Sequence, residues 1–197
     1  MKKLMTFAVV AMMALTASAQ TPTWVVRAGL DVANVVGKDI PDDAGSRIGY
    51  YVGGEMQLPV ITENMYLSAG LGLKTKGYKY DKGGVKNDMN HGALEIPVNI
   101  GYKIPLAEDF KFAVHGGVFA DFDLYGKTTY ESGGVKTETK LGDYQDYTKF
   151  AFGFAVGGGI WYKQFNLDIN WQRALNKQMK DTKAFESNVL ITLGYAF

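Results

Sequence analysis

An alternation between charged and uncharged positions is the feature that most limits how this chain can fold. From Ile48 to Leu58 the even positions carry Ile, Tyr, Val, Gly, Met and Leu, whereas the odd positions carry Gly, Tyr, Gly, Glu and Gln. Successive side chains of a β-strand point to opposite faces, so a repeat of two predicts a strand with one apolar face. The same repeat recurs in seven other segments. The sequence therefore predicts eight strands.

The lengths of the strands and their connections indicate the architecture. The predicted strands cover residues 23–33, 47–58, 65–78, 92–104, 110–125, 148–163, 165–173 and 185–197. Most match the roughly 9 to 11 residues of a tilted strand that crosses a membrane. Short connections alternate with long ones, and the long ones are residues 34–46, 80–91, 126–147 and 174–184. We therefore expect an all-β fold, an eight-stranded antiparallel up-and-down transmembrane β-barrel with short periplasmic turns, longer extracellular loops and both termini in the periplasm.

The uncharged face of these strands is predicted to contact lipid. It contains no Asp, Glu, Lys or Arg, although 21% of the chain is charged. A Lys or Arg facing lipid costs about 2 to 4 kcal/mol at the bilayer midplane, which explains that absence. A soluble lipocalin-like barrel would instead turn its apolar face inward. We favour the membrane barrel, because Phe150, Phe152 and Phe154 are too bulky for an eight-stranded lumen and the small residues between them suit it.

The opposite face is predicted to fill the lumen with charge. Five of its Lys and Arg side chains oppose six carboxylates, and His115 joins them. Charges removed from water persist only when they are paired and hydrogen-bonded, so we expect a structural salt-bridge network that plugs the interior. Its predicted members are Arg27, Asp31, Glu55, Lys74, Lys76, Glu95, Lys103, Lys111, His115, Asp121, Asp123 and Asp168.

The first 19 residues have the pattern of a signal peptide. Lys2 and Lys3 precede an apolar run from Leu4 to Leu15, and a small-residue cleavage pattern ends at Ala19. An uncleaved anchor is the alternative, but the run is shorter than the roughly 20 residues that a spanning helix needs. We therefore predict a signal peptide at residues 1–19 and one barrel domain at residues 20–197.

Composition excludes several classes of protein. Cysteine is absent, so the chain has neither disulfides nor a thiolate metal site. The net charge is +1 with no basic stripe, so nucleic-acid binding has no support. No other apolar stretch approaches the length of a spanning helix, which excludes a helical membrane protein. We predict no cofactor and no metal site, and we expect a monomer.

Two motifs carry resemblances to known proteins. The last strand, with Tyr195 and Phe197, resembles the C-terminal signal by which the barrel assembly machinery recognises its substrates. Leu94-Glu95-Ile96-Pro97 followed by Tyr102-Lys103 resembles the outer membrane protein β-barrel domain family, the PorT-like group of small Gram-negative barrels. This resemblance implies the barrel fold and the Gram-negative outer membrane, with its lipids as surroundings, and no settled activity. Pro97 cannot donate to the ladder, so we expect a bulge there.

Two predicted loops share a short sequence motif. Residues 80–86 and 130–136 both contain Gly-Gly-Val-Lys after a Tyr and an acidic residue. A Gly pair supplies the positive φ angles of a tight turn, so both segments are predicted to be hairpin tips that extend strands beyond the membrane. The alternative is that both segments carry the same ligand-binding motif.

The sequence indicates location better than function. Its only histidines are His91 and His115, and no spacing fixes a catalytic partner for His91. We predict a non-enzymatic envelope-structural protein whose surface loops are available for adhesion to an extracellular protein or glycan, or for partner binding. The alternatives are a lipid A-modifying hydrolase or acyltransferase that uses His91, and a narrow solute channel. Candidate partners considered for His91 are Asp81, Asp88, Asp143, Asp146, Ser132 and Ser187.

Overall fold

The computed structural model describes residues 21–37, 45–143, 147–177 and 184–197. The predicted signal peptide lies outside these residues. Nine strands and one short 3-10 helix are described. They are β1 (Thr23–Gly37), β2 (Gly45–Val60), β3 (Thr62–Lys82), β4 (Val85–Pro105), β5 (Phe110–Ser132), β6 (Val135–Lys140), η1 (Leu141–Asp143), β7 (Phe150–Tyr162), β8 (Phe165–Ala174) and β9 (Ala184–Ala196). Within this part of the chain, no helix has both the length and the apolar character needed to cross a membrane.

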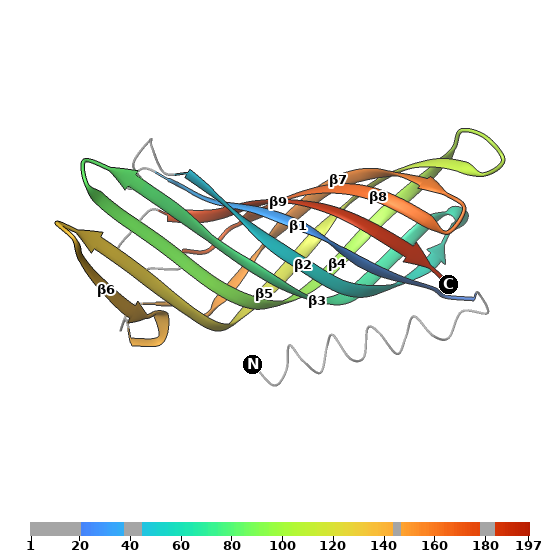
Figure 1. Cartoon of the computed structure of the whole chain (residues 1–197). Coiled ribbons are helices and arrows are strands. Elements are labelled where there is room, and N and C mark those ends of the chain that lie inside the picture. Colours follow the sequence, from blue (N-terminus) through green and yellow to red (C-terminus); the bar gives the residue numbers. More distant parts are fainter. Residues whose placement is uncertain (1–20, 38–44, 144–146, 178–183) are drawn as a thin grey trace, which may run out of the picture.

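Eight of the strands close into a ring. All pairings are antiparallel, and the order is β4-β3-β2-β1-β9-β8-β7-β5-β6 with an additional pairing of β4 with β5. That last pairing joins the two ends of the eight-stranded sheet, and β6 stays outside the ring beside β5 (Figure 1). The predicted eight-stranded antiparallel barrel is confirmed. Both the start of β1 and the end of β9 lie at one end of the barrel, here called the terminal end.

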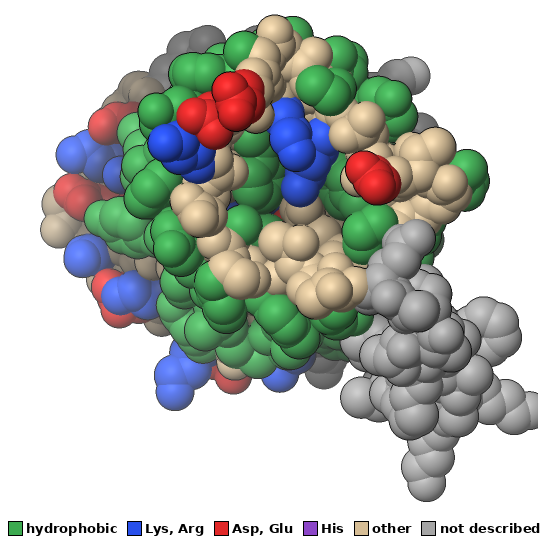
Figure 2. Space-filling model, turned by 90° about the vertical axis from the view of Figure 1, so that its right-hand side faces the viewer, with side chains coloured by type: hydrophobic (Ala, Val, Ile, Leu, Met, Phe, Trp, Pro, Cys, Tyr) green, Lys and Arg blue, Asp and Glu red, His purple; other side chains and the backbone are tan. Residues whose placement is uncertain are grey.

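The apolar face of each strand points away from the lumen, as the sequence predicts. Trp24, Val52 and Val156 are 50%, 56% and 55% exposed, whereas Val25 and Ala155 beside them are 1% exposed. Viewed from the terminal end, hydrophobic side chains cover the barrel wall and Lys or Arg side chains stand within the mouth (Figure 2). The exposed apolar area therefore forms the band that a membrane barrel presents to lipid.

The lumen nevertheless accepts some aromatic rings. Tyr51, Tyr66, Phe119 and Trp161 are each less than 9% exposed and face inward. An eight-stranded lumen can therefore hold aromatic side chains, contrary to the expectation drawn from their size. Glycine explains the difference: a Cβ at Gly101, which pairs with Tyr66, would collide with the Tyr66 ring. Backbone positions without side chains create the space that these rings occupy.

Pro97 is accommodated without the predicted bulge. Ala69 pairs with Val98 and Gly72 pairs with Glu95, so the register of β3 and β4 is the same on both sides of Pro97. Only the two intervening pairs are missing from the ladder. Because a proline removes one donor and inserts no residue, the strands can skip a bond and continue in step. The expected bulge at this position is wrong.

Two of the predicted long loops are largely strand. Residues 80–91 belong to β3 and β4, whose tip is at Gly83 and Gly84 with φ angles of 62° and 79°. In the predicted 126–147 loop, β5 continues to Ser132 and returns as β6 through Gly133 and Gly134 with φ angles of 58° and 81°. Both hairpin tips are confirmed. The error lies in the polar composition of these strands, which lack an apolar alternation although Met89 and His91 are buried.

These extensions form a second structural unit at the end opposite the termini. We call it the protruding sheet, made of residues 77–90 of the β3–β4 hairpin and residues 127–140 of the β5–β6 hairpin. Beyond Phe122 the strand β5 no longer pairs with β7, and from Lys127 onward it pairs with β6 instead. In Figure 1 the two hairpins extend past the rest of the barrel wall. Two regions of the fold could therefore carry function: the lumen and the protruding sheet.

Candidate functional site in the lumen and the protruding sheet

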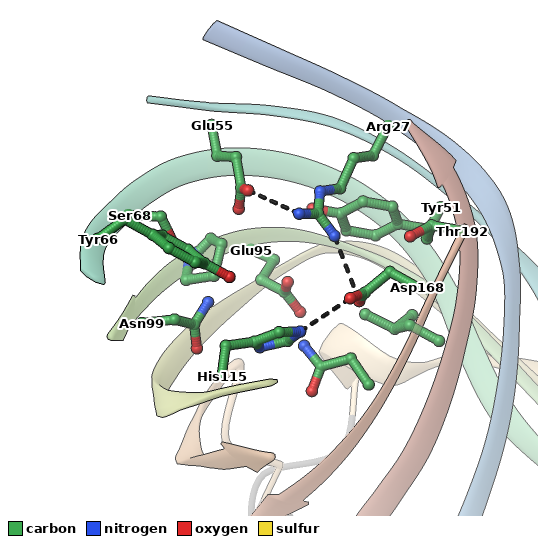
Figure 3. Close-up of a pocket in the computed structure, with 13 residues that line it drawn as sticks. Arg27, Tyr51, Glu55, Tyr66, Ser68, Glu95, Asn99, His115, Asp168 and Thr192 are labelled. Atoms are coloured by element: carbon green, nitrogen blue, oxygen red, sulfur yellow. Dashed lines mark hydrogen bonds and ion pairs between the residues drawn. The ribbon is translucent and has the colours of Figure 1, made fainter. Parts of the chain in front are cut away.

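A chain of charged side chains crosses the lumen near the terminal end. Arg27 of β1 donates through Nη2 to Glu55 Oε1 at 2.8 Å, and its Nη1 lies 3.2 Å from Asp168 Oδ1. The other oxygen of Asp168 lies 2.9 Å from His115 Nε2 (Figure 3). Four strands, β1, β2, β8 and β5, supply these groups because each presents every second residue to the interior. This is the terminal-end cluster.

A second cluster lies deeper, toward the protruding sheet. Lys74 Nζ lies 2.5 Å from Glu95 Oε2 and 2.9 Å from Asp121 Oδ2. Lys76 Nζ shares the same Asp121 oxygen at 3.1 Å and lies 2.6 Å from Glu186 Oε2. These side chains are at most 5% exposed, so water does not separate them. This is the deep cluster.

The two clusters leave little free space between them. A cavity of about 30 Å³ is lined by residues of both, including Arg27, Glu95 and His115 (Figure 3). That space holds roughly one or two water molecules. Buried charges are retained only when geometry and hydrogen bonds offset their desolvation, and these clusters meet that condition. The lumen is therefore a packed polar core over this stretch.

Some predicted members of the network lie elsewhere. Lys111 is exposed and forms no ion pair with a described residue, because the second position of β5 lies at the mouth of the barrel. Lys103 donates to Gln57 Oε1 at 2.7 Å and stands 4.0 Å from the centre of the Trp161 ring, a cation–π contact in place of the expected carboxylate. Asp31 is fully buried, and neither of its oxygens has a hydrogen-bond partner among the described residues.

Sequence reasoning missed two side chains of the deep cluster. Gln172 accepts a hydrogen bond from Lys74 at 2.8 Å and donates to Glu95 at 3.0 Å. Glu186 pairs with Lys76 near the start of β9. Both occupy positions that alternate with the lipid-facing residues of their strands, so the sequence pattern does place them inward. Gln172 carries no formal charge, and Glu186 lies before Val189, where the apolar alternation of β9 begins.

Asp123 connects this region to the chain after β6. Its carboxylate lies 3.4 Å from Lys76 Nζ and accepts a hydrogen bond from the Tyr147 hydroxyl. His91 belongs to the same group of side chains. Its ring is fully buried, and Nε2 lies 2.9 Å from Glu186 Oε1 and 3.8 Å from Asp123 Oδ1.

Two of the candidate catalytic partners of His91 have other contacts. Asp88 pairs with Arg47, and the Ser187 hydroxyl accepts a hydrogen bond from Trp171 Nε1 at 3.0 Å. Asp146 lies outside the described residues. No group of three or more potential metal ligands gathers around one point in the described part of the chain. His91 is thus a member of the lumen network, joined to Glu186.

The proposed assembly signal lies on the outer wall. The Tyr195 and Phe197 side chains are exposed, and Tyr195 packs edge-on against Phe165 with ring centres 5.2 Å apart. Phe197 N donates to Trp24 O at 2.9 Å. The last residue therefore closes the seam between the first and last strands, and its role as a recognition signal stays a prediction.

The protruding sheet carries charge of both signs on one face. Arg47 pairs with Asp88, and Glu138 accepts hydrogen bonds from Lys127 at 3.2 and 3.3 Å. A groove of about 360 Å³ runs over this face, lined by Arg47, Lys86, Asp88, Asn90, Lys127, Thr129, Glu131, Lys136 and Glu138. Such a surface does not suit acyl tails, because lipid-facing charges are costly. It suits water and polar partners.

Comparison with protein families matches residues 18–179 to the family described as outer membrane protein beta-barrel domain. Among solved structures, Neisserial surface protein A is 12% identical with a TM-score of 0.50, covering 88% of this chain and 97% of that protein. Ail of Yersinia pestis, solved with the heparin analogue sucrose octasulfate, is 11% identical with a TM-score of 0.47 and coverages of 89% and 99%. OprG of Pseudomonas aeruginosa is 12% identical with a TM-score of 0.46 and coverages of 90% and 97%. Comparison with curated proteins found no match.

Proposed function

Because the chain belongs to the outer membrane protein β-barrel domain family, we propose that it is a non-enzymatic surface protein whose protruding sheet binds partners outside the cell. Its barrel lies in the Gram-negative outer membrane, among the lipids of that membrane. In this proposal the terminal end faces the periplasm and the protruding sheet faces outward. One observation carries the proposal: the β3–β4 and β5–β6 hairpins extend beyond the ring, and no strand in the described part of the chain pairs with the second edge of β6.

The protruding sheet has the properties of a binding element. Main-chain hydrogen bonds continue from β3 to β6, so the sheet is held in shape by the ladder rather than by a core. Side chains of both signs cover one face. Binding residues are commonly carried on surface segments that a rigid scaffold positions, and a closed barrel is such a scaffold. The sheet therefore supports adhesion better than it supports any internal role.

The lumen supports neither alternative function. A solute channel needs a continuous open path, whereas the terminal-end and deep clusters fill the interior and leave a cavity of about 30 Å³. A lipid-modifying enzyme needs its base within reach of a substrate at the outer leaflet. The His91 ring is buried inside the barrel wall beside Glu186.

A clipped variant tests the binding role of the protruding sheet. Lys127 and Lys140 are cross-strand neighbours, so replacing residues 127–140 with Asn-Gly joins Gly126 to Leu141 through a tight turn. We expect cells that display the wild type to bind at least one of two probes: heparin, or cells that display the same protein. Cells that display the clipped variant are expected to bind no more of these probes than cells without the protein. Heat-modifiable migration in gels checks that the barrel still folds. Equal binding by both forms contradicts the proposal.

A second prediction separates binding from lipid chemistry. His91→Ala is expected to leave the lipid A mass spectrum identical to that of cells with the wild-type protein and of cells without the gene, because the ring is fully buried beside Glu186. His115→Ala is the matched control, since His115 also pairs with a lumen carboxylate, Asp168. A lipid A species that depends on the gene and disappears only in His91→Ala would overturn the non-enzymatic assignment.

A further inference from the structure

Among the strands that the structure describes, β6 has one neighbour, β5. Val135–Lys140 pairs with residues 127–132 of β5, and no described strand pairs with its other edge. All six side chains are exposed except that of Thr139, which is half-buried. A free edge presents unpaired N–H and C=O groups, which makes it a template for another strand. An extended segment can therefore add to the protruding sheet at β6.

Charge alternates along β6 in a way that restricts what can pair there. Lys136, Glu138 and Lys140 share one face of the strand, and Val135, Thr137 and Thr139 share the other. The hydrogen bond from Lys127 holds the pKa of the exposed Glu138 carboxyl below its usual value. Glu138 is therefore ionised at neutral pH. A strand that adds to this edge must present an anion opposite Lys136 and a cation opposite Glu138.

The strand itself meets that requirement. We propose that β6 pairs antiparallel with β6 of a second copy of this chain, with Thr137 opposite Thr137. In this register Lys136 of each copy lies opposite Glu138 of the other, which gives two cross-strand ion pairs. This inference rests on the proposed function, since it needs the protruding sheet to be exposed at the cell surface.

Other antiparallel registers are less favourable. Centring the pair on Lys136 or on Glu138 places like charges directly opposite each other, which destabilises a sheet. Centring it on Thr139 aligns Glu138 with Lys140 but engages only residues 138–140 of the strand. The Thr137 register engages residues 135–139. Among the four registers centred on Lys136, Thr137, Glu138 or Thr139, it is therefore the longest in which every charged pair has opposite signs.

Strand direction decides where the second copy stands. β6 follows the hairpin tip and runs back toward the barrel (Figure 1). In any copy within the same membrane, β6 also runs toward that membrane. Antiparallel pairing requires opposite directions, so the second copy must come from a facing membrane. The symmetric contact is thus a homotypic bridge between two cells, in which the same patch serves both partners.

Charge-reversal variants in two cell populations test this pairing. Lys136→Glu places Glu opposite Glu138, and Glu138→Lys places Lys opposite Lys136, so each variant alone is expected to lose aggregation to the level of cells without the protein. Mixing the two populations restores both ion pairs, and two-colour flow cytometry is expected to show mixed aggregates at the wild-type level. Such rescue also shows that both variants fold. Absence of mixed aggregates overturns the proposed register.

A cysteine variant tests the symmetry directly. The chain has no cysteine, so Thr137→Cys introduces a single thiol. Directly opposed residues have Cα atoms about 4.5 to 5.5 Å apart, within the range that a disulfide bridges. Purified Thr137→Cys protein, one copy per lipid nanodisc, is expected to form disulfide-linked dimers under mild oxidation. Val135→Cys, which lies opposite Thr139, is the matched control and is expected to form several-fold fewer. Equal yields contradict the pairing.

The outcomes separate this inference from the function on which it rests. If the clipped variant binds every probe as the wild type does, the binding role of the protruding sheet fails. If clipping abolishes binding but the mixed charge variants are not rescued, only the pairing of two copies fails. Both sets of results are obtained from the same strains.

Discussion

Asp121→Asn lowers the free energy of unfolding by about 3–5 kcal/mol, as expected for breaking a buried ion pair. One oxygen of Asp121 lies 2.9 Å from Lys74 Nζ and 3.1 Å from Lys76 Nζ, and all three side chains are fully buried. Removing the carboxylate charge leaves two ammonium groups close together without the anion between them. Lys74 keeps Glu95 and Lys76 keeps Glu186 as partners, but the repulsion between the two ammonium groups is no longer offset by a shared anion.

Urea unfolding in lipid vesicles, followed by tryptophan fluorescence, measures this effect. Asp109→Asn is the matched control, because Asp109 pairs with Lys163 at 3.5 Å while both side chains are about half exposed. Its expected change is within about 0.5 kcal/mol, since exposed pairs contribute little. If the two variants unfold at the same urea concentration, the deep cluster does not stabilise the barrel.

Val156→Arg is expected to destabilise the barrel by about 2–4 kcal/mol, because it places a charge on the lipid-facing wall. Val156 lies in the middle of β7 and is 55% exposed. In a water-soluble protein, a substitution at so exposed a site would change stability by no more than about 0.5 kcal/mol. The size of the effect therefore reports directly on what surrounds the barrel.

The protruding sheet supplies the control for this second experiment. Val135 is 69% exposed and lies in β6, outside the ring. Val135→Arg makes the same chemical change where the surroundings are water, so its effect on the urea midpoint is expected to be near zero. Equal losses at the two positions would contradict the proposed boundary between the lipid-facing wall and the protruding sheet.

The alternation of side chains was enough to predict the strands and which residues share a face. The assignment of the uncharged face to lipid also used the bulk of its aromatic side chains, because a soluble barrel can turn an uncharged face inward. The alternation also placed Arg27, Lys74 and Asp121 in the lumen. The same signal failed for residues 80–91, because most of these residues are polar and the strand positions cannot be recognised from apolar alternation.

Contacts within the lumen depended on register, which the sequence does not show. Lys76 meets Glu186 across 110 positions, and Lys74 meets Gln172 across 98. A shift of one residue between strands would turn either side chain to the opposite face. The alternation along a strand shows that a residue points inward. Its height along the barrel axis depends on how all the strands are staggered. This is why Lys103 meets Trp161 rather than a carboxylate.

The sequence by itself determined the strands, the lipid-facing wall and the two glycine hairpin tips, since each follows from local geometry and from the cost of placing charge in lipid. Only the tertiary structure decided that His91 is buried against Glu186 and that Asp31 lies beside the deep cluster without a hydrogen-bond partner among the described residues. It also decided that β6 stands outside the ring, where its second edge pairs with no described strand. Those features arise where the sheet closes on itself, because closure brings together strands whose separation along the chain carries no information about their contact.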